Sequence, residues 1–201
     1  MYIVCSDLEG VLVPEIWINV SRKTGIEELK LTTRDISDYD ELMKRRLAIL
    51  KDHDIKLSDI QYVISTITPL PGAKEFISWL RNSMQLIIVS DTFTEFAGPL
   101  LRQLDFPTIF CNSLITDMEG RIIDYKLRQK DGKRKVAEAL QSLNYKVIGI
   151  GDSYNDISML KQSDTGILFN PPDAIKAANP DLHVTRNYIE LRDYIRTIVN
   201  Q

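Results

Sequence analysis

Short runs of apolar, largely β-branched residues recur along the chain, and each ends in polar or acidic residues. The clearest runs cover residues 2–5, 86–89 and 146–150, which precede Ser6-Asp7, Ser90-Asp91 and Gly151-Asp152. Because these runs do not alternate between apolar and polar positions, they are typical of parallel strands that are buried on both faces. We therefore predict a buried strand at each of the three places.

The segments between and after these runs have helical or strand periodicity. Residues 73–83 and 133–143 repeat apolar side chains at intervals of three and four, as amphipathic helices do. The same patterns predict strands over residues 166–169 and 183–185, helices over residues 171–178 and 188–199, and a hairpin over residues 115–127 that turns at Glu119-Gly120. Alternation of strands and helices predicts an α/β fold, doubly wound around a mainly parallel sheet.

Residues 15–69 differ from the rest of the chain. They are charged and helical in period and contain no convincing buried strand, and Pro69 and Pro71-Gly72 then interrupt the chain. We interpret this stretch as a small helical cap inserted after the first strand. The α/β core then comprises residues 1–14 and 70–201, with hinges near residue 14 and at residues 69–72.

Composition narrows the classes of function. The 201 residues include 25 Lys and Arg against 28 Asp and Glu, a net charge of −3, and no basic run, so we expect neither nucleic acid nor an acidic membrane surface as a partner. Cys5 and Cys111 stand far apart, which excludes a disulfide framework or a thiolate zinc site. We expect a cytoplasmic protein that acts on a small molecule, and nothing in the sequence indicates an oligomeric state.

The candidate chemistry lies where the predicted strands end. Acidic residues follow all three, namely Asp7, Glu9, Asp91, Asp152 and Asp156. Because ligands of a parallel sheet bind beyond the carboxyl ends of its strands, these side chains should surround one crevice. Their mutual repulsion requires a cation, and an all-oxygen ligand set without Cys or His favours Mg²⁺. The alternative is that strand-end aspartates only cap the following helices.

Four motifs in order resemble the haloacid-dehalogenase superfamily of aspartyl-phosphate phosphotransferases. They are Asp7-Leu8-Glu9-Gly10-Val11-Leu12, Val89-Ser90-Asp91-Thr92, the basic Lys133, and Gly151-Asp152-Ser153-Tyr154-Asn155-Asp156. The helical insertion directly after the first motif makes the chain similar to the phosphoserine phosphatase branch. Within that branch it is most similar to bacterial enzymes that hydrolyse phosphoserine and also transfer its phosphoryl group to homoserine.

The reaction centre that physical reasoning and the resemblance imply contains a nucleophile, an acid/base and a metal. A carboxylate such as Asp7 can attack phosphorus and form an acyl phosphate, while Glu9 protonates the leaving oxygen and later deprotonates the acceptor. Mg²⁺ would be held by Asp7, Asp152 and the backbone carbonyl of Glu9, with Asp156 bound through water.

The resemblance also implies the substrate-binding groups. The Ser90 hydroxyl, the Asp91 backbone N–H and Lys133 would hold the phosphoryl group. Lys130, Arg134 and Lys135 lie close to Lys133, and only the family's placement of its lysine at the start of this helix selects Lys133. Glu15 and Arg46 match the family's pair for the substrate ammonium and carboxylate, and Asn155 should contact substrate or phosphate. Without the resemblance, Glu15 and Arg46 would be interpreted as ordinary surface residues.

Glu9 departs from the family pattern, because most phosphatases of the superfamily carry Asp there. The extra methylene moves the carboxyl group by roughly 1.5 Å, enough to change which hydroxyl is activated. Our hypothesis is therefore that water and an amino-alcohol acceptor such as homoserine share the aspartyl phosphate. Two alternatives stay open: a phosphatase for another small phosphomonoester, and a non-catalytic, receiver-like module that senses phosphate.

Overall fold

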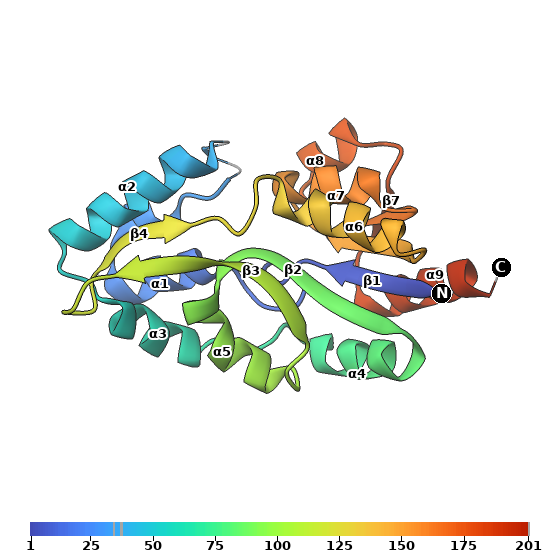
Figure 1. The fold of residues 1–201 in the computed structure, drawn as a ribbon, viewed down its shortest axis with the longest axis horizontal. Helices are drawn as coiled ribbons and strands as arrows, with labels where there is room; N and C mark the ends of the chain where they lie inside the picture. The colour runs from blue at the N-terminus through green and yellow to red at the C-terminus, as the bar shows by residue number, and fades with distance from the viewer. Residues whose placement is uncertain (34, 37, 201) are drawn as a thin grey trace.

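The core of the molecule is a seven-stranded sheet in the order β4-β3-β2-β1-β5-β6-β7 (Figure 1). This computed structural model describes residues 1–33, 35–36 and 38–200. The strands are β1 Tyr2–Ser6, β2 Gln85–Phe93, β3 Thr108–Thr116, β4 Ile122–Lys126, β5 Lys146–Gly151, β6 Thr165–Phe169 and β7 His183–Thr185. Only β4 runs antiparallel to its neighbour. The predicted doubly wound α/β fold is confirmed.

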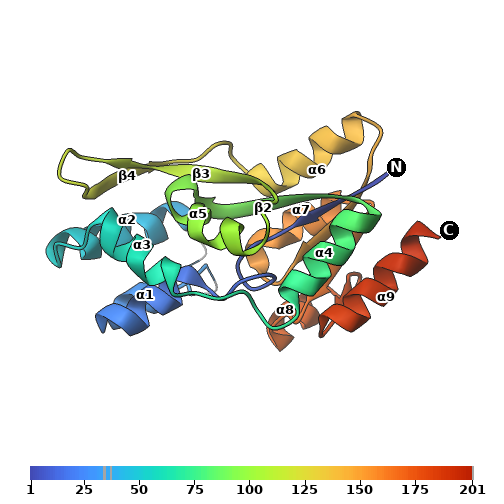
Figure 2. The same cartoon turned by 90° about the horizontal axis from the view of Figure 1, so that it is seen from below.

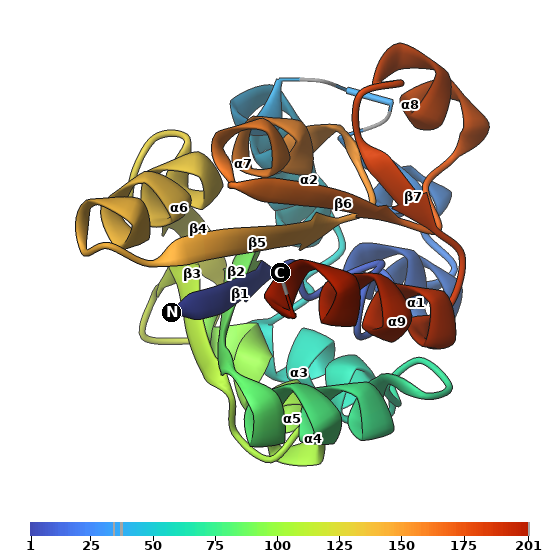
Figure 3. The ribbon, with the colours of Figure 1, turned by 90° about the vertical axis from the view of Figure 1, so that its right-hand side faces the viewer.

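Helices cover both faces of the sheet (Figures 2 and 3). One face carries α4 Ala73–Ser83, α5 Thr94–Gln103 and α9 Tyr188–Val199, and the other carries α6 Gly132–Ser142, α7 Ile157–Gln162 and α8 Asp173–Ala178. Successive residues of β1 enter different hydrophobic clusters, Val4 on the α4 side and Ile3 and Cys5 on the α6 side. Burial on both faces explains why the strand runs do not alternate in polarity.

The hairpin prediction needs correction at its start. An antiparallel pair does form, between residues 113–116 and 122–126, but β3 begins at Thr108 and its first half pairs in parallel with β2. Helices α5 and α7 were not predicted.

In the described part of the predicted cap segment the regular secondary structure is helical, apart from one isolated bridge between Lys56 and Arg121. These helices are α1 Ile16–Thr24, η1 Glu27–Lys30, α2 Tyr39–Asp52 and α3 Leu57–Ser65, and they lie at one end of the molecule beside β4 (Figure 1). The two connections to the core run side by side, since the Leu70 N–H donates to the Leu12 carbonyl at 2.9 Å. Within the described residues no helix is long and apolar enough to span a bilayer.

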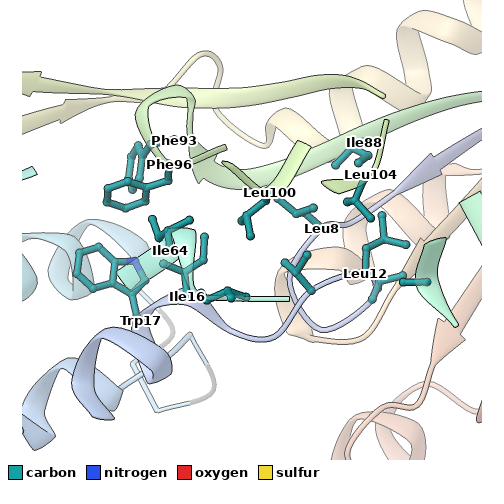
Figure 4. Close-up of a cluster of buried hydrophobic side chains, with 14 of the residues drawn as sticks. Leu8, Leu12, Ile16, Trp17, Ile64, Ile88, Phe93, Phe96, Leu100 and Leu104 are labelled. Atoms are coloured by element: carbon teal, nitrogen blue, oxygen red, sulfur yellow. The ribbon is translucent and has the colours of Figure 1, made fainter. Parts of the chain in front are cut away.

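One hydrophobic cluster joins the cap helices to the sheet (Figure 4). Ile16, Trp17 and Ile64 from the cap segment pack in the same cluster as Leu8 and Ile88, which belong to the sheet end. Helices α1 and α3 therefore pack near the ends of the central strands, where the acidic residues lie.

Candidate active site

The central strands β2, β1 and β5 bring the predicted motifs to one edge. Asp7 directly follows β1 and Asp152 directly follows β5, and the Asp7 N–H donates to the Ile150 carbonyl at 2.9 Å. Ser90 and Asp91 lie within β2 and not beyond it, at a shift in the β2–β3 register between Val89 and Phe93. This irregularity turns the strand out of the regular ladder at the crevice.

Lys133, in the first turn of α6, connects three of the carboxylates. Its Nζ lies 2.7 Å from Asp156 Oδ1, 2.9 Å from Asp7 Oδ2 and 3.5 Å from Asp91 Oδ2, and the side chain is only 4% exposed. Burial alone would lower the pKa of Lys133, but the carboxylates of Asp156, Asp7 and Asp91 outweigh it and hold the pKa well above its usual value. The site therefore contains a fixed positive charge at every physiological pH.

The other basic residues of this segment lie outside the site. Lys130 is exposed, Arg134 pairs with Asp131 and Glu138, and Lys135 pairs with Glu138 at 2.8 Å. The structure thus places only Lys133 among these candidates in contact with the strand-end carboxylates.

Asp7, Asp152 and Asp156 form a buried acidic group in which one oxygen of each lies within 4.8 Å of the others. Burial raises the pKa of Asp7 well above its usual range, Asp156 and Asp152 raise it further, and Lys133 opposes them only in part. Asp156 is held in place because its Oδ2 accepts from the backbone N–H groups of Asp152 and Ser153, at 2.9 and 3.0 Å.

The donor set suits a hard divalent cation, because three buried carboxylates offer only oxygen. The backbone at Gly10 packs closely against Asp152, one of these carboxylates. Gly10 has φ +77, and a Cβ at this position would lie 2.4 Å from the Asp152 carboxyl carbon. Gly10 is therefore required both by its left-handed backbone and by the approach of Asp152.

Glu9 extends from the end of β1 toward the cap. Its Oε2 accepts a hydrogen bond from the Ile16 N–H, at the start of α1, at 2.8 Å. Burial, together with repulsion from Glu15, raises the pKa of Glu9 to about 7. The Ile16 N–H, Arg46 and Lys133 oppose this shift only in part. A carboxyl group with such a pKa can both donate and accept a proton near neutrality.

Arg46 closes the cavity from the cap side. Although the sequence pattern alone favoured a surface position, the residue is only 6% exposed, and its Nη2 donates to the Leu31 carbonyl at 2.8 Å. Burial lowers the pKa of Arg46 to about 10, and Tyr39, Glu9 and Glu15 oppose that shift, so the guanidinium stays charged. Glu15 lies nearby, at the position that precedes α1.

A cavity of about 70 Å³ lies between the strand ends and the cap, room for a few waters or a small molecule. Its walls bring together Asp7, Glu9, Glu15, Arg46, Ser90, Asp91, Lys133 and Asn155, all predicted from the sequence. Asp152 and Asp156 lie close to Asp7 but are not among the described residues that line the cavity.

Three lining aromatic residues, Trp17, Tyr39 and Phe93, were not predicted. Tyr39 begins α2 and donates its hydroxyl to the Asp91 carbonyl at 3.0 Å, and Trp17 lies in α1 beneath Arg46. Asn155, which was predicted, donates to Asp91 Oδ2 at 2.8 Å. The only sequence signal for Trp17 is its place two residues after Glu15, and no pattern distinguishes Tyr39 from other tyrosines.

Comparison with known proteins gives a consistent picture. Residues 3–164 match the haloacid dehalogenase-like hydrolases. The chain is 56% identical to the phosphoserine phosphatase of Pseudomonas syringae pv. tomato, over 94% of this chain and 80% of that protein. It is 54% identical to the phosphoserine phosphatase ThrH of Pseudomonas aeruginosa, over 96% of this chain and 94% of that protein. A solved phosphoserine phosphatase in its apo form shares the fold, with a TM-score of 0.78 at 24% identity, over 97% of this chain and 98% of that one.

Proposed function

Since this chain belongs to the haloacid dehalogenase-like hydrolases, we propose that it hydrolyses O-phospho-L-serine through an aspartyl phosphate formed on Asp7. The single observation that carries the proposal is the cavity in which Asp7, paired at 2.9 Å with the buried Lys133, faces Glu9 and Arg46. Curated relatives above 50% identity that bear the name phosphoserine phosphatase support the choice of substrate.

The chain's own groups suffice to describe both half-reactions. An Asp7 carboxylate oxygen attacks phosphorus, the bond from phosphorus to the serine oxygen breaks, and Glu9 gives its proton to that oxygen. In the second step water attacks phosphorus, Glu9 takes the proton and the Asp7 carboxylate is released. Asp7 is oriented throughout, since its Oδ1 accepts from the Leu8 N–H at 2.7 Å. Lys133 and the Ser90 hydroxyl stabilise the phosphoryl oxygens.

Asp7, Asp152 and Asp156 fit Mg²⁺ by donor type and burial, and the Glu9 backbone carbonyl would add a ligand. When bound, the ion offsets the repulsion between the Asp7 carboxylate and the phosphoryl group. Asp156 would bind the ion through water, and its oxygens accept hydrogen bonds from Lys133 and from two backbone N–H groups.

Selectivity for phosphoserine would come from the cap, residues 15–69. Arg46 offers a charged fork for the substrate carboxylate and Glu15 a carboxylate for its ammonium group.

Cys5 and Cys111 are both free thiols, which supports the proposed cytoplasmic location.

The proposed function is tested by phosphate release from phosphoserine in Mg²⁺, in EDTA, and in EDTA followed by excess Mg²⁺. We expect turnover in Mg²⁺, loss of at least about 100-fold in EDTA, and recovery when Mg²⁺ returns, because the acidic group would otherwise repel the phosphate. Cleavage of other phosphomonoesters without phosphoserine would favour the broader phosphatase. Release from none of them would favour the receiver-like module.

We also propose that homoserine competes with water for the aspartyl phosphate. This proposal rests on Glu9, which stands where most of the superfamily has Asp. Phosphorus NMR of a reaction with phosphoserine and homoserine is expected to show O-phosphohomoserine beside inorganic phosphate. The matched variant Glu9→Asp, with its shorter side chain, is expected to shift the product ratio toward phosphate. Inorganic phosphate as the only product of the wild type would contradict transfer.

The double role of Glu9 predicts a distinctive result for Glu9→Gln. With phosphoserine, turnover is expected to fall by about 10²–10⁴-fold, because the leaving oxygen is no longer protonated. With p-nitrophenyl phosphate, whose leaving group needs no proton, we expect a burst of about one nitrophenol per site and then slow turnover, since water is no longer deprotonated. If Glu9→Gln lowered the burst amplitude and the steady-state rate by the same factor, the double role of Glu9 would be contradicted.

A further inference from the structure

Arg46 is a buried cation whose hydrogen-bonding capacity is only partly used. Nη2 donates to the Leu31 carbonyl at 2.8 Å, and Nη1 has Met43 Sδ at 3.7 Å, a weak acceptor. In the part of the chain that the structure describes, Nε has no hydrogen-bond partner. A buried guanidinium with unused N–H groups on a cavity wall is arranged to receive an anion.

Trp17 lies against this guanidinium. The Arg46 Cζ lies 4.5 Å from the centroid of the Trp17 ring, within the range of a cation–π contact. A guanidinium that stacks on an aromatic ring keeps its edge, which carries the N–H groups, available to a planar carboxylate. Trp17 also lines the cavity itself and is 7% exposed.

Aromatic contacts fix Trp17 in turn against the core (Figure 4). Trp17 meets Phe96 of α5 edge to face, with ring centroids 5.8 Å apart, and Phe96 meets Phe93 edge to face at 5.5 Å. Phe93 ends β2, the strand that also carries Ser90. The guanidinium is thereby held in a defined place relative to the groups proposed to bind phosphate.

We propose that Trp17 is a positioning residue that orients Arg46 toward the substrate carboxylate and so sets the preference for carboxylate-bearing phosphomonoesters. This inference rests on the proposed function. In the described part of the chain Trp17 is not among the hydrogen-bond or ion-pair partners of Asp7 and Lys133. Its loss should therefore change KM for substrates with a carboxylate and leave kcat intact.

The test compares phosphoserine with phosphoethanolamine, which has the same phosphate and ammonium groups but no carboxylate. For Trp17→Leu we expect KM for phosphoserine to rise by about 10-fold with kcat within about twofold of wild type. For phosphoethanolamine, KM, or Ki as a competitive inhibitor, should stay within about twofold. Trp17→Phe keeps an aromatic face and packs more like the wild type, and it should raise KM for phosphoserine by only about two- to fourfold.

Trp79 provides the matched control, because it also has an arginine over its ring, Arg196 at 5.5 Å, but does not line the cavity. Trp79→Leu should leave selectivity unchanged. In an Arg46→Lys background, Trp17→Leu should cause no further change, since lysine lacks the planar fork on which Trp17 acts.

Three outcomes would overturn the inference. They are an equal loss on both substrates, an unchanged KM for phosphoserine in both Trp17 variants, and a full additional effect of Trp17→Leu in the Arg46→Lys background. Absence of phosphoserine turnover by the wild type would overturn the proposed function, and this inference with it. Normal wild-type turnover with unchanged selectivity in the variants would overturn the inference alone.

Discussion

Asp7→Asn is expected to lower kcat for phosphoserine by at least about 10³-fold, because an amide cannot form the acyl phosphate through which both half-reactions pass. The replacement has almost the same shape, so the cavity should persist. Mass spectrometry of the wild type after a rapid acid quench should locate the phosphoryl adduct on the peptide that contains Asp7. Residual turnover of the variant near the wild-type rate, with no adduct on the wild type, would contradict the mechanism.

The same substitution should not destabilise the fold in the absence of metal. Burial and the neighbouring Asp156 and Asp152 raise the pKa of Asp7, so its ionised form opposes folding at neutral pH despite Lys133. We expect Asp7→Asn to have an equal or higher Tm in EDTA, together with the loss of activity. Asp193→Asn, on the exposed surface of α9, is a control that should change neither quantity. A large fall in Tm would mean that inactivity reflects unfolding.

The sequence pattern predicted those elements whose side chains face a core on a regular period. The core strands and helix α4 have such a pattern, and the strands are buried on both faces. Helix α5 was missed because Gly98 and Pro99 interrupt it, residues that weaken or break isolated helices. The first half of β3 was missed because exposed residues interrupt its burial pattern.

The site residues divide in the same way, into those that a sequence pattern predicts and those that it does not. Asp7 and Asp152 were predicted because parallel strands end at one edge, a rule that holds for any sequence of this class. Lys133 and Arg46 could be selected only through the family resemblance, since each has basic neighbours of similar character. Trp17 lies against Arg46 through the packing of two cap helices that are distant in sequence, which no local pattern encodes. Burial distinguishes such residues from their neighbours, and burial follows from tertiary packing.

Lys133→Met is expected to reduce both activity and stability, for one electrostatic reason. Lys133 donates to Asp156 at 2.7 Å and lies 2.9 Å from Asp7, and both aspartates are nearly inaccessible to solvent. Removing one partner leaves buried charge uncompensated, which typically costs about 3–5 kcal/mol of stability. Loss of the positive charge beside the phosphoryl oxygens should also lower kcat/KM by at least about 100-fold.

The loss of stability should depend on pH with a definite sign. The pKa of Lys133 is raised above its usual value, so Lys133 is fully charged between pH 5 and 8. Its contribution to the stability of the wild type is therefore complete across this range. Without Lys133 the pKa of Asp7 rises further, the folded state binds more protons than the unfolded state, and stability falls as pH increases. Denaturant unfolding in EDTA should therefore show a larger deficit for Lys133→Met at about pH 8 than at about pH 5.

Lys135→Met is the matched control on the same helix, because Lys135 pairs only at the surface, with Glu138 at 2.8 Å. Its stability should lie within about 0.5 kcal/mol of the wild type at both pH values, as expected for an exposed ion pair. A deficit for Lys133→Met that is the same at both pH values would show that lost packing, and not uncompensated carboxylate charge, causes it. In that case Lys133 would have no electrostatic hold on Asp7.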